Sequence, residues 1–137
     1  MRGERNHRQL QKMMAPQLLT ETYVYCTFPD FQLPDGLAPI CTFREAEGLT
    51  AIVERSQAEC AQAPFIFESR LITLTVHSSL DAIGFLATVS TCLAQAGIPC
   101  NAIAAYHHDH LFVPVDRAHE ALSLLQALSA DCAPTAV

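Results

Sequence analysis

The sequence predicts an α+β protein in which helices cover one face of antiparallel strands. The clearest observation is the order strand, helix, strand, strand, helix over residues 70–129, read from hydrophobic residues that first alternate and then recur every three or four positions. A second observation is the four-residue connection between the last two strands, which is too short for a parallel crossover. Half of the 137 residues are hydrophobic, so the chain suits one compact domain or two small modules that share a core.

Residues 70–77 predict the first strand of this unit, because their hydrophobic side chains alternate. Ser78, followed by Asp81 three residues later, is typical of a capping box, so we expect a helix to begin here. Gly97 suits the left-handed residue that ends a helix. The hydrophobic positions are Ile72, Leu74 and Val76 in the strand and Ile83, Leu86, Val89 and Leu93 in the helix.

Residues 101–106 and 111–115 predict two further strands, joined as an antiparallel hairpin. Asp116 can cap a last helix, which has a hydrophobic stripe on one side. That stripe consists of Ala118, Ala121, Leu122, Leu125 and Leu128.

The first half of the chain has less regular patterns. The elements predicted there are a short helix ending near Pro16, strands at 22–28, 37–43 and 49–53, a helix at 56–61 and an extended segment at 65–68. We divide the chain into an N-terminal module, residues 1–66, and a C-terminal module, residues 67–137. We expect residues 1–9 and 130–137 to fray, as chain ends do.

Composition narrows the range of partners and compartments. The net charge of −6 repels a phosphate backbone, so we expect no nucleic-acid partner. No apolar run approaches the roughly 18 residues of a membrane span, and the basic start leads into no signal peptide, so we expect a cytoplasmic protein without a membrane partner. The six cysteines include no C-x-x-C pair, and we interpret them as reduced, buried side chains.

Several motifs resemble those of the ACT domain. Residues 81–84, DAIG, are similar to the D-x-x-G turn of ACT sequences, and residues 96–103, AGIPCNAI, to their Gly-Ile stretch. Residues 42–50, 72–80 and 108–114 read TFREAEGLT, ITLTVHSSL and HDHLFVP. Together these stretches resemble a family of small, free-standing bacterial proteins with tandem ACT-like modules, similar to the regulatory ACT region of aspartate kinases. The resemblance extends over nearly the whole chain.

The resemblance implies two ferredoxin-like modules of the βαββαβ type, packed side by side, with antiparallel sheets that carry helices on one face. It also implies a homodimer. A complete ACT unit has a strand after its second helix, so either the first half supplies that strand or the second module remains without it. In ACT pairs, small ligands lie at the seam, between the turn after the first strand of one module and the start of the second strand of its neighbour.

The turn at residues 77–84 is the main candidate for a ligand site. The N–H groups of Ile83 and Gly84 could hold the carboxylate of a free amino acid, and Asp81 could pair with its ammonium group. The alternative is that Asp81 belongs only to a capping box and that Gly84 only lets a strand pack closely. Asn101, which carries both donor and acceptor atoms, could complete the site from a neighbouring module. The ligand-binding candidates are His77, Ser78, Ser79, Asp81, Ile83, Gly84, Ile98 and Asn101.

Three of the six histidines lie within residues 107–110, HHDH. In a strand, His108 and His110 would point to the same face at a spacing that metal ligands use. The stretch also lies where the hairpin reverses, and turns collect Asp and other polar residues. We therefore favour a polar turn, and a metal site built on His108 and His110 is the alternative.

These observations predict a regulatory or sensor protein of the ACT type, which holds a small molecule, an amino acid, at a seam between modules or subunits. The sequence contains no Ser-His-Asp order, glycine-rich phosphate loop or H-E-x-x-H motif, so we expect neither an enzyme nor a cofactor. The expected partners are the ligand, a second copy of the chain and a separate enzyme. Two alternatives stay open: a metal-binding or hydrolytic protein that uses the histidines, and a ligand-free dimerisation module.

Overall fold

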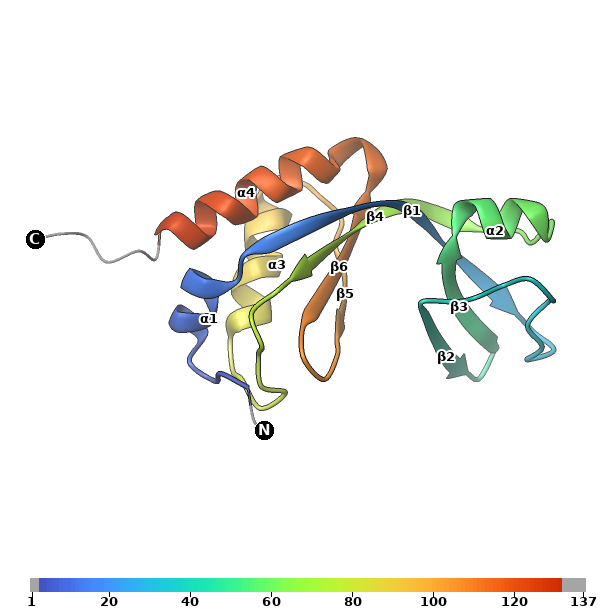
Figure 1. The fold of residues 1–137 in the computed structure, drawn as a ribbon, viewed down its shortest axis with the longest axis horizontal. Helices are drawn as coiled ribbons and strands as arrows, with labels where there is room; N and C mark the ends of the chain where they lie inside the picture. The colour runs from blue at the N-terminus through green and yellow to red at the C-terminus, as the bar shows by residue number, and fades with distance from the viewer. Residues whose placement is uncertain (1–2, 132–137) are drawn as a thin grey trace, which may run out of the picture.

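A computed structural model describes residues 3–131 and shows one six-stranded antiparallel sheet with helices packed against one of its faces (Figure 1). The strands lie in the order β2-β3-β1-β4-β6-β5. The elements are α1 (His7–Met13), β1 (Pro16–Phe28), β2 (Cys41–Glu45), β3 (Gly48–Glu54), α2 (Arg55–Cys60), β4 (Ile66–Leu74), α3 (Phe85–Gln95), β5 (Asn101–Ala104), β6 (Asp109–Pro114), the 3-10 turn η1 (Val115–Arg117) and α4 (Ala118–Asp131). Within residues 3–131, no helix is long and apolar enough to cross a membrane.

The two central strands, β1 and β4, belong to both halves of the molecule. The start of β1, Pro16 to Leu18, pairs with Ile72 to Leu74 at the end of β4, and the later residues of β1 pair with β3. The second half therefore has the strand order β1-β4-β6-β5, and the first half has the matching order β4-β1-β3-β2. The strand that the second module lacks after its last helix thus comes from the first half of the chain.

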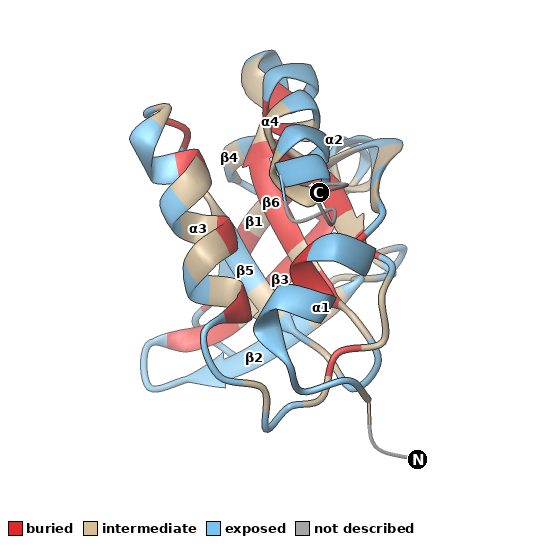
Figure 2. Ribbon diagram, turned by 90° about the vertical axis from the view of Figure 1, so that its left-hand side faces the viewer, coloured by how far each residue is buried: buried red, intermediate tan, exposed pale blue. Residues whose placement is uncertain are grey.

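The two halves differ in their helices. In the first half, residues 29–40 form a loop between β1 and β2, and the short helix α2 packs against β1 and β3. The second half has α3 and α4, and the N-terminal helix α1 packs against both of them (Figure 2). The burial pattern in Figure 2 follows this arrangement, because the buried positions of these helices face the sheet.

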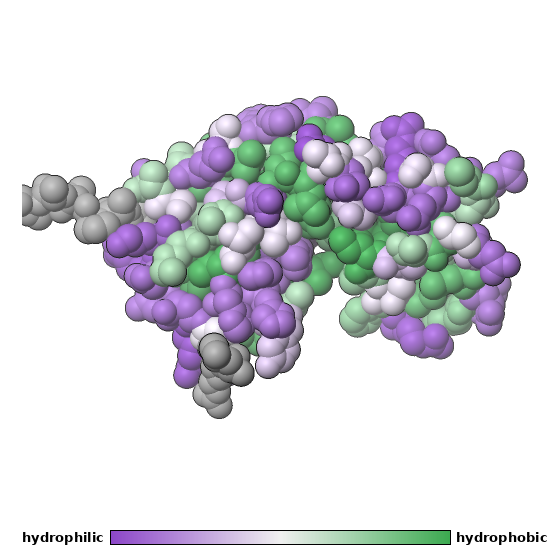
Figure 3. Space-filling view, viewed as in Figure 1, coloured by the Kyte–Doolittle hydropathy of each residue, from purple (hydrophilic) through white to green (hydrophobic). Residues whose placement is uncertain are grey.

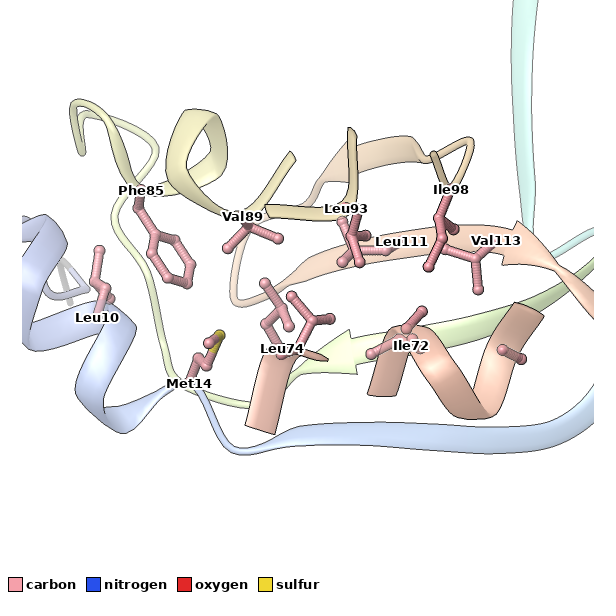
Figure 4. Packing of buried hydrophobic residues seen from close by; sticks show 13 residues of the cluster. Leu10, Met14, Ile72, Leu74, Phe85, Val89, Leu93, Ile98, Leu111 and Val113 are labelled. Atoms are coloured by element: carbon pink, nitrogen blue, oxygen red, sulfur yellow. The ribbon is translucent and has the colours of Figure 1, made fainter. Parts of the chain in front are cut away.

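The largest core lies between the sheet of the second half and its three helices (Figure 4). Val89 and Leu93 of α3 meet Leu111 and Val113 of β6, as the three-to-four-residue spacing of the helix predicts. Full burial of such a side chain contributes about 1.5–3 kcal/mol relative to exposure. The other buried members are Leu10, Met14, Ile72, Leu74, Phe85, Ile98, Ala118, Ala121 and Leu125.

A smaller cluster occupies the opposite, helix-free face of the sheet. Its buried members are Tyr23, Ile52, Leu71 and Phe112. The rings of Tyr23 and Phe112 meet edge to face with their centroids 5.8 Å apart, a favourable geometry for aromatic pairs. In the space-filling view, hydrophobic residues gather along the boundary between the two halves, above the hollow that separates the β5–β6 and β2–β3 hairpins (Figure 3).

The structure corrects several expected boundaries; the strand expected at 22–28, for example, already starts at Pro16. The helix expected to start at Asp81 starts at Phe85, so the Ser78–Asp81 capping box does not form. Instead, Ser79 Oγ accepts a 3.1 Å hydrogen bond from the Asp81 N–H, and this local turn replaces the first helical turn. The segments expected at 65–68 and 70–77 are one strand, which Phe67, with φ of 59°, bends where the pairing with β1 is irregular.

The structure describes part of each chain end. Of residues 1–9, which we expect to fray, residues 1–2 lie outside the described residues. The helix α1 begins at His7, and Asn6 caps it by accepting hydrogen bonds of 3.0 and 3.1 Å from the N–H groups of Arg8 and Gln9. At the other end, α4 continues to Asp131, and the rest of the tail expected to fray, 132–137, lies outside the described residues.

Candidate functional site

The connection between β4 and α3 is anchored to β6 by a buried polar pair. Ser78 Oγ donates a 3.0 Å hydrogen bond to Asp109 Oδ2. Only 5% of Ser78 and 6% of Asp109 are exposed. The N–H of Ser78 also donates to the carbonyl of His107, at 3.2 Å. The β4–α3 connection and the start of β6, about thirty residues apart in the sequence, are thus joined by a side-chain hydrogen bond.

A small cavity opens beside this pair. Its volume is about 200 Å³, and it lies between the β4–α3 turn, the first turn of α3 and the adjoining ends of β5 and β6. Both residues of the pair belong to its wall, together with apolar residues from the turn and from α3. The lining residues are Ser78, Ser79, Leu80, Ala82, Phe85, Leu86, Ala104 and Asp109.

The first turn of α3 contributes Phe85 and Leu86 to the cavity wall, and its N-terminal N–H groups have no side-chain cap. Gly84 is the N-cap residue, with φ of 91°, and it has no side chain that could accept from the following N–H groups. A helix start of this kind carries a partial positive charge and suits an anion. A Cβ added at Gly84 would meet only His7 Cγ, at 3.9 Å, so the backbone is accessible on this side.

The N-terminal segment lies along the turn, which local sequence patterns did not indicate. The N–H of Glu4 donates to the carbonyl of His77 at 2.9 Å, and the N–H of Ser79 donates to the carbonyl of Glu4 at 2.8 Å. Gly3 packs so closely that an added Cβ would lie 2.7 Å from the His77 oxygen. Residues 3 and 4 therefore form one edge of the candidate site.

Two family models match the chain, both described as the ACT domain, over residues 2–70 and residues 66–127. The chain belongs to the ACT domain family. The resemblance noted in the sequence is confirmed, and the pair of matches corresponds to two tandem ACT domains in one small chain.

Solved structures agree with this assignment. A Vibrio cholerae protein of unknown function, described as a possible transport protein, is 43% identical, with 89% of this chain and 94% of that chain covered and a TM-score of 0.80. An Agrobacterium tumefaciens protein is 15% identical, with coverages of 83% and 87% and a TM-score of 0.69. The regulatory subunit of aspartate kinase from Thermus flavus is 11% identical, with coverages of 82% and 95% and a TM-score of 0.63. The last two similarities show a shared fold. A comparison with curated proteins finds no match.

In ACT terms, the candidate site is the turn between the first strand and first helix of the second module. Ser78 and Ser79 line the cavity, and Gly84 caps α3 beside it. Asp81 is exposed at the turn, and Ile83 is 82% exposed. His77 lies at the edge, where its ring centroid is 5.1 Å from that of His107.

Two other candidates lie away from this turn. Ile98 is 3% exposed and packs in the main core, so its side chain is not accessible to a ligand. Asn101 is exposed at the start of β5, whereas the cavity touches Ala104 at the end of that strand. Within one chain Asn101 does not meet the turn, and only a second copy could bring the two together.

The HHDH stretch has separate contacts for each of its side chains. The chain reverses at residues 105–108, and Asp109 already belongs to β6. His108 Nδ1 lies 3.1 Å from the Val76 carbonyl, and His110 Nδ1 lies 3.0 Å from Thr73 Oγ1. No group of three His, Cys, Asp or Glu side chains with metal-binding geometry occurs among residues 3–131.

Cys26, Cys92 and Cys100 are poor nucleophiles at neutral pH, whereas Cys60 is exposed, contrary to the expectation of buried cysteines. Burial raises the pKa of the Cys100 thiol to about 11, and it also raises the pKa values of Cys26 and Cys92. Since the thiolate is the reactive form, these three thiols have low nucleophilic reactivity. ACT domains are regulatory rather than catalytic modules, and family membership therefore supports a ligand-binding regulatory role.

Proposed function

We propose that this protein is an ACT-type sensor that binds a free amino acid at the β4–α3 turn and changes its association with another protein. The observation that carries the proposal is the start of α3, which has a glycine N-cap and no side-chain cap, beside a cavity of about 200 Å³. A helix start that lacks its own cap can use an external anion to satisfy its N–H groups.

The ligand carboxylate binds the N–H groups of Ile83 and Gly84 in this proposal. Gly84 favours such contact, because it lacks a side chain and the nearest described atom to an added Cβ is 3.9 Å away. The exposed carboxylate of Asp81 and the hydroxyl of Ser79 stand at the same turn and contact the rest of the ligand.

A second copy of the chain closes the site. β2 and β5 are the outermost strands of the sheet, and an edge strand offers unpaired N–H and carbonyl groups to a partner. Asn101 opens β5 and is exposed, so a neighbouring subunit can present its amide to the ligand. The fold shared with the regulatory subunit of an aspartate kinase supports a separate enzyme as the regulated partner.

A thermal-shift screen of the free amino acids tests this function. A ligand that binds only the folded protein stabilises it by about 2.7 kcal/mol at one hundred times its Kd, which raises the melting temperature by several degrees. We expect Asp81→Ala and Asn101→Ala to reduce this shift while they change the unligated melting temperature little, because both side chains are exposed.

The matched control is Asp35→Ala, which removes an exposed carboxylate from the loop of the first half. It should leave the ligand-induced shift unchanged. If no amino acid raises the melting temperature and the protein is nevertheless a stable dimer by light scattering, the proposal fails and a ligand-free dimerisation module takes its place.

A further inference from the structure

The carboxylate of Asp109 is buried without a positively charged partner among residues 3–131. Its one hydrogen bond in the structure comes from the hydroxyl of Ser78, which is neutral. The ion pairs of the described residues join Arg55 with Glu59 and Glu68, and Arg117 with Glu120, all near the surface. Asp109 takes part in none of them.

The burial of the Asp109 carboxylate has an energetic cost that its described contacts offset only in part. Removal of a carboxylate from water costs several kcal/mol unless charge pairing or hydrogen bonds compensate for it. One hydroxyl donor satisfies only a fraction of the roughly four lone-pair sites of a carboxylate. Asp109 also belongs to the wall of the cavity, where a ligand could supply a further donor.

We propose that Asp109 binds the ammonium group of a small α-amino acid, and that Ser78 holds the carboxylate in place for this contact. The inference rests on the proposed function and deepens it, because it moves the ammonium group from the exposed Asp81 to a buried residue. The cavity then has two poles. Asp109 supplies the negative pole, and the uncapped start of α3 supplies the positive pole for the ligand carboxylate.

The cavity volume limits the size of the ligand. About 200 Å³ corresponds to the liquid volume of roughly six or seven water molecules. Glycine, alanine and serine have about that number of non-hydrogen atoms, whereas nucleotides and aromatic amino acids have many more. The apolar part of the wall, from Leu80, Phe85 and Leu86, suits a short aliphatic side chain.

Isothermal titration of the full chain with glycine, L-alanine and L-serine tests the assignment on two matched variants. Asp109→Asn keeps the shape and an acceptor for Ser78 but removes the charge, and we expect its affinity to fall roughly tenfold to a hundredfold, as for loss of a charged hydrogen-bond partner. Asp81→Asn removes the exposed carboxylate at the same turn and should lower affinity much less. An equal affinity for the Asp109→Asn variant and the wild type would overturn the inference, and so would a larger loss in Asp81→Asn.

A second measurement uses the wild-type protein alone and so does not depend on how the variants fold. N-acetylglycine and propionate lack the ammonium group, and we expect neither to compete with the amino acid that binds. If either binds as tightly as that amino acid, the ammonium contact is absent and Asp109 has another role.

A double-mutant cycle of Asp109→Asn with Arg2→Ala, a residue outside the described range, is a third check. Strong coupling in the free energy of unfolding would assign the missing cation to the chain itself and would also overturn the inference.

These outcomes separate the two proposals. Binding of an amino acid that is insensitive to Asp109→Asn removes the inference and leaves the proposed function intact. Absence of binding by all amino acids removes both.

Discussion

At the residue scale, burial changes the acid–base chemistry of His110, the histidine that follows Asp109. Burial lowers the pKa of His110 below its usual 6.5, and nearby His108 lowers it further, whereas Asp109 acts in the opposite direction. The folded protein therefore holds His110 neutral to a lower pH than the unfolded chain does. The stability that this neutral form contributes is complete above pH 6.5 and is lost as the pH falls from 6.5 through the folded pKa.

We predict that His110→Gln makes the free energy of unfolding less dependent on pH. The wild type should lose stability as the pH falls below about 6.5, and the variant should lose less, because Gln keeps a polar atom for Thr73 but does not titrate. Urea denaturation at a series of pH values measures this slope. His7→Gln, an exposed position in α1, is the matched control and should follow the wild type. Parallel slopes for wild type and His110→Gln would remove the histidine as the cause.

Sequence patterns predicted single residues well only where a regular spacing fixes their burial. Val89 and Leu93 recur at helical spacing, and both are fully buried. The buried pair of Ser78 and Asp109 was not predictable, because it joins two segments whose pairing depends on the completed sheet. The burial of Ile98 in the main core was not predictable for a similar reason, since a strand start and a core position have the same local pattern.

At the element scale, glycines fix where the helices and hairpins begin and end. Gly97 follows α3 with φ of 72°, as its position in the sequence predicted, and an added Cβ would meet nothing within 4 Å. Gly48 begins β3, and an added Cβ would lie 2.8 Å from the Phe28 carbonyl oxygen. Position 97 requires glycine only for its positive φ, whereas position 48 also requires the absence of a side chain beside strand β1.

We predict that Gly97→Ala costs about 1 kcal/mol, the strain of a left-handed alanine. Gly48→Ala should cost more than this, because the backbone of Phe28 has to move as well. Urea unfolding of the two variants gives both values. Gly97→Asn serves as a control with a smaller loss, since Asn tolerates the left-handed region. Equal decreases in the free energy of unfolding at positions 48 and 97 would mean that the backbone of Phe28 can move away from residue 48 at little cost.

The start of α3 shows why element boundaries were harder to predict than the elements. Ser78 and Asp81 have the spacing of a capping box, but Ser79 forms a tighter turn with the N–H of Asp81 and delays the helix to Phe85. Two local hydrogen-bond patterns competed over the same residues, and the sequence alone did not rank them. The helix itself, the burial of Val89 and Leu93 and the end at Gly97 were predicted correctly. Ile83, which was expected on the hydrophobic face, precedes α3 and is 82% exposed.

At the scale of the whole molecule, β1 and β4 join the two ACT domains into one sheet. The second domain uses Pro16 to Leu18 as its outer strand, and Leu10 and Met14 of the N-terminal segment are fully buried in its core. The family resemblance predicted the two modules, and the α+β class with helices on one face is confirmed. Hydrophobic periodicity did not show that each module pairs with a strand of the other, because the alternation along one strand indicates which face is buried and not which strand lies beside it.

We predict that the two halves unfold together and that neither folds alone. A fragment of residues 67–137 lacks the strand that borders β4 and the helix that covers α3 and α4, so it should show no cooperative transition in urea. For the full chain, circular dichroism and tyrosine fluorescence should give one coincident transition. A cooperative transition of the isolated fragment would show that the borrowed strand is dispensable.

The reciprocal use of β1 and β4 also restricts how the protein can change over generations. A substitution in either of these strands has to suit two domains at once, whereas one in β2 or β5 has to suit only one domain and its outer rim. If one half were replaced by the homologous half of a relative, the half that remains would have to pair with a central strand of different sequence. An alignment of relatives should therefore show the two central strands drifting together and the two outermost strands diversifying independently.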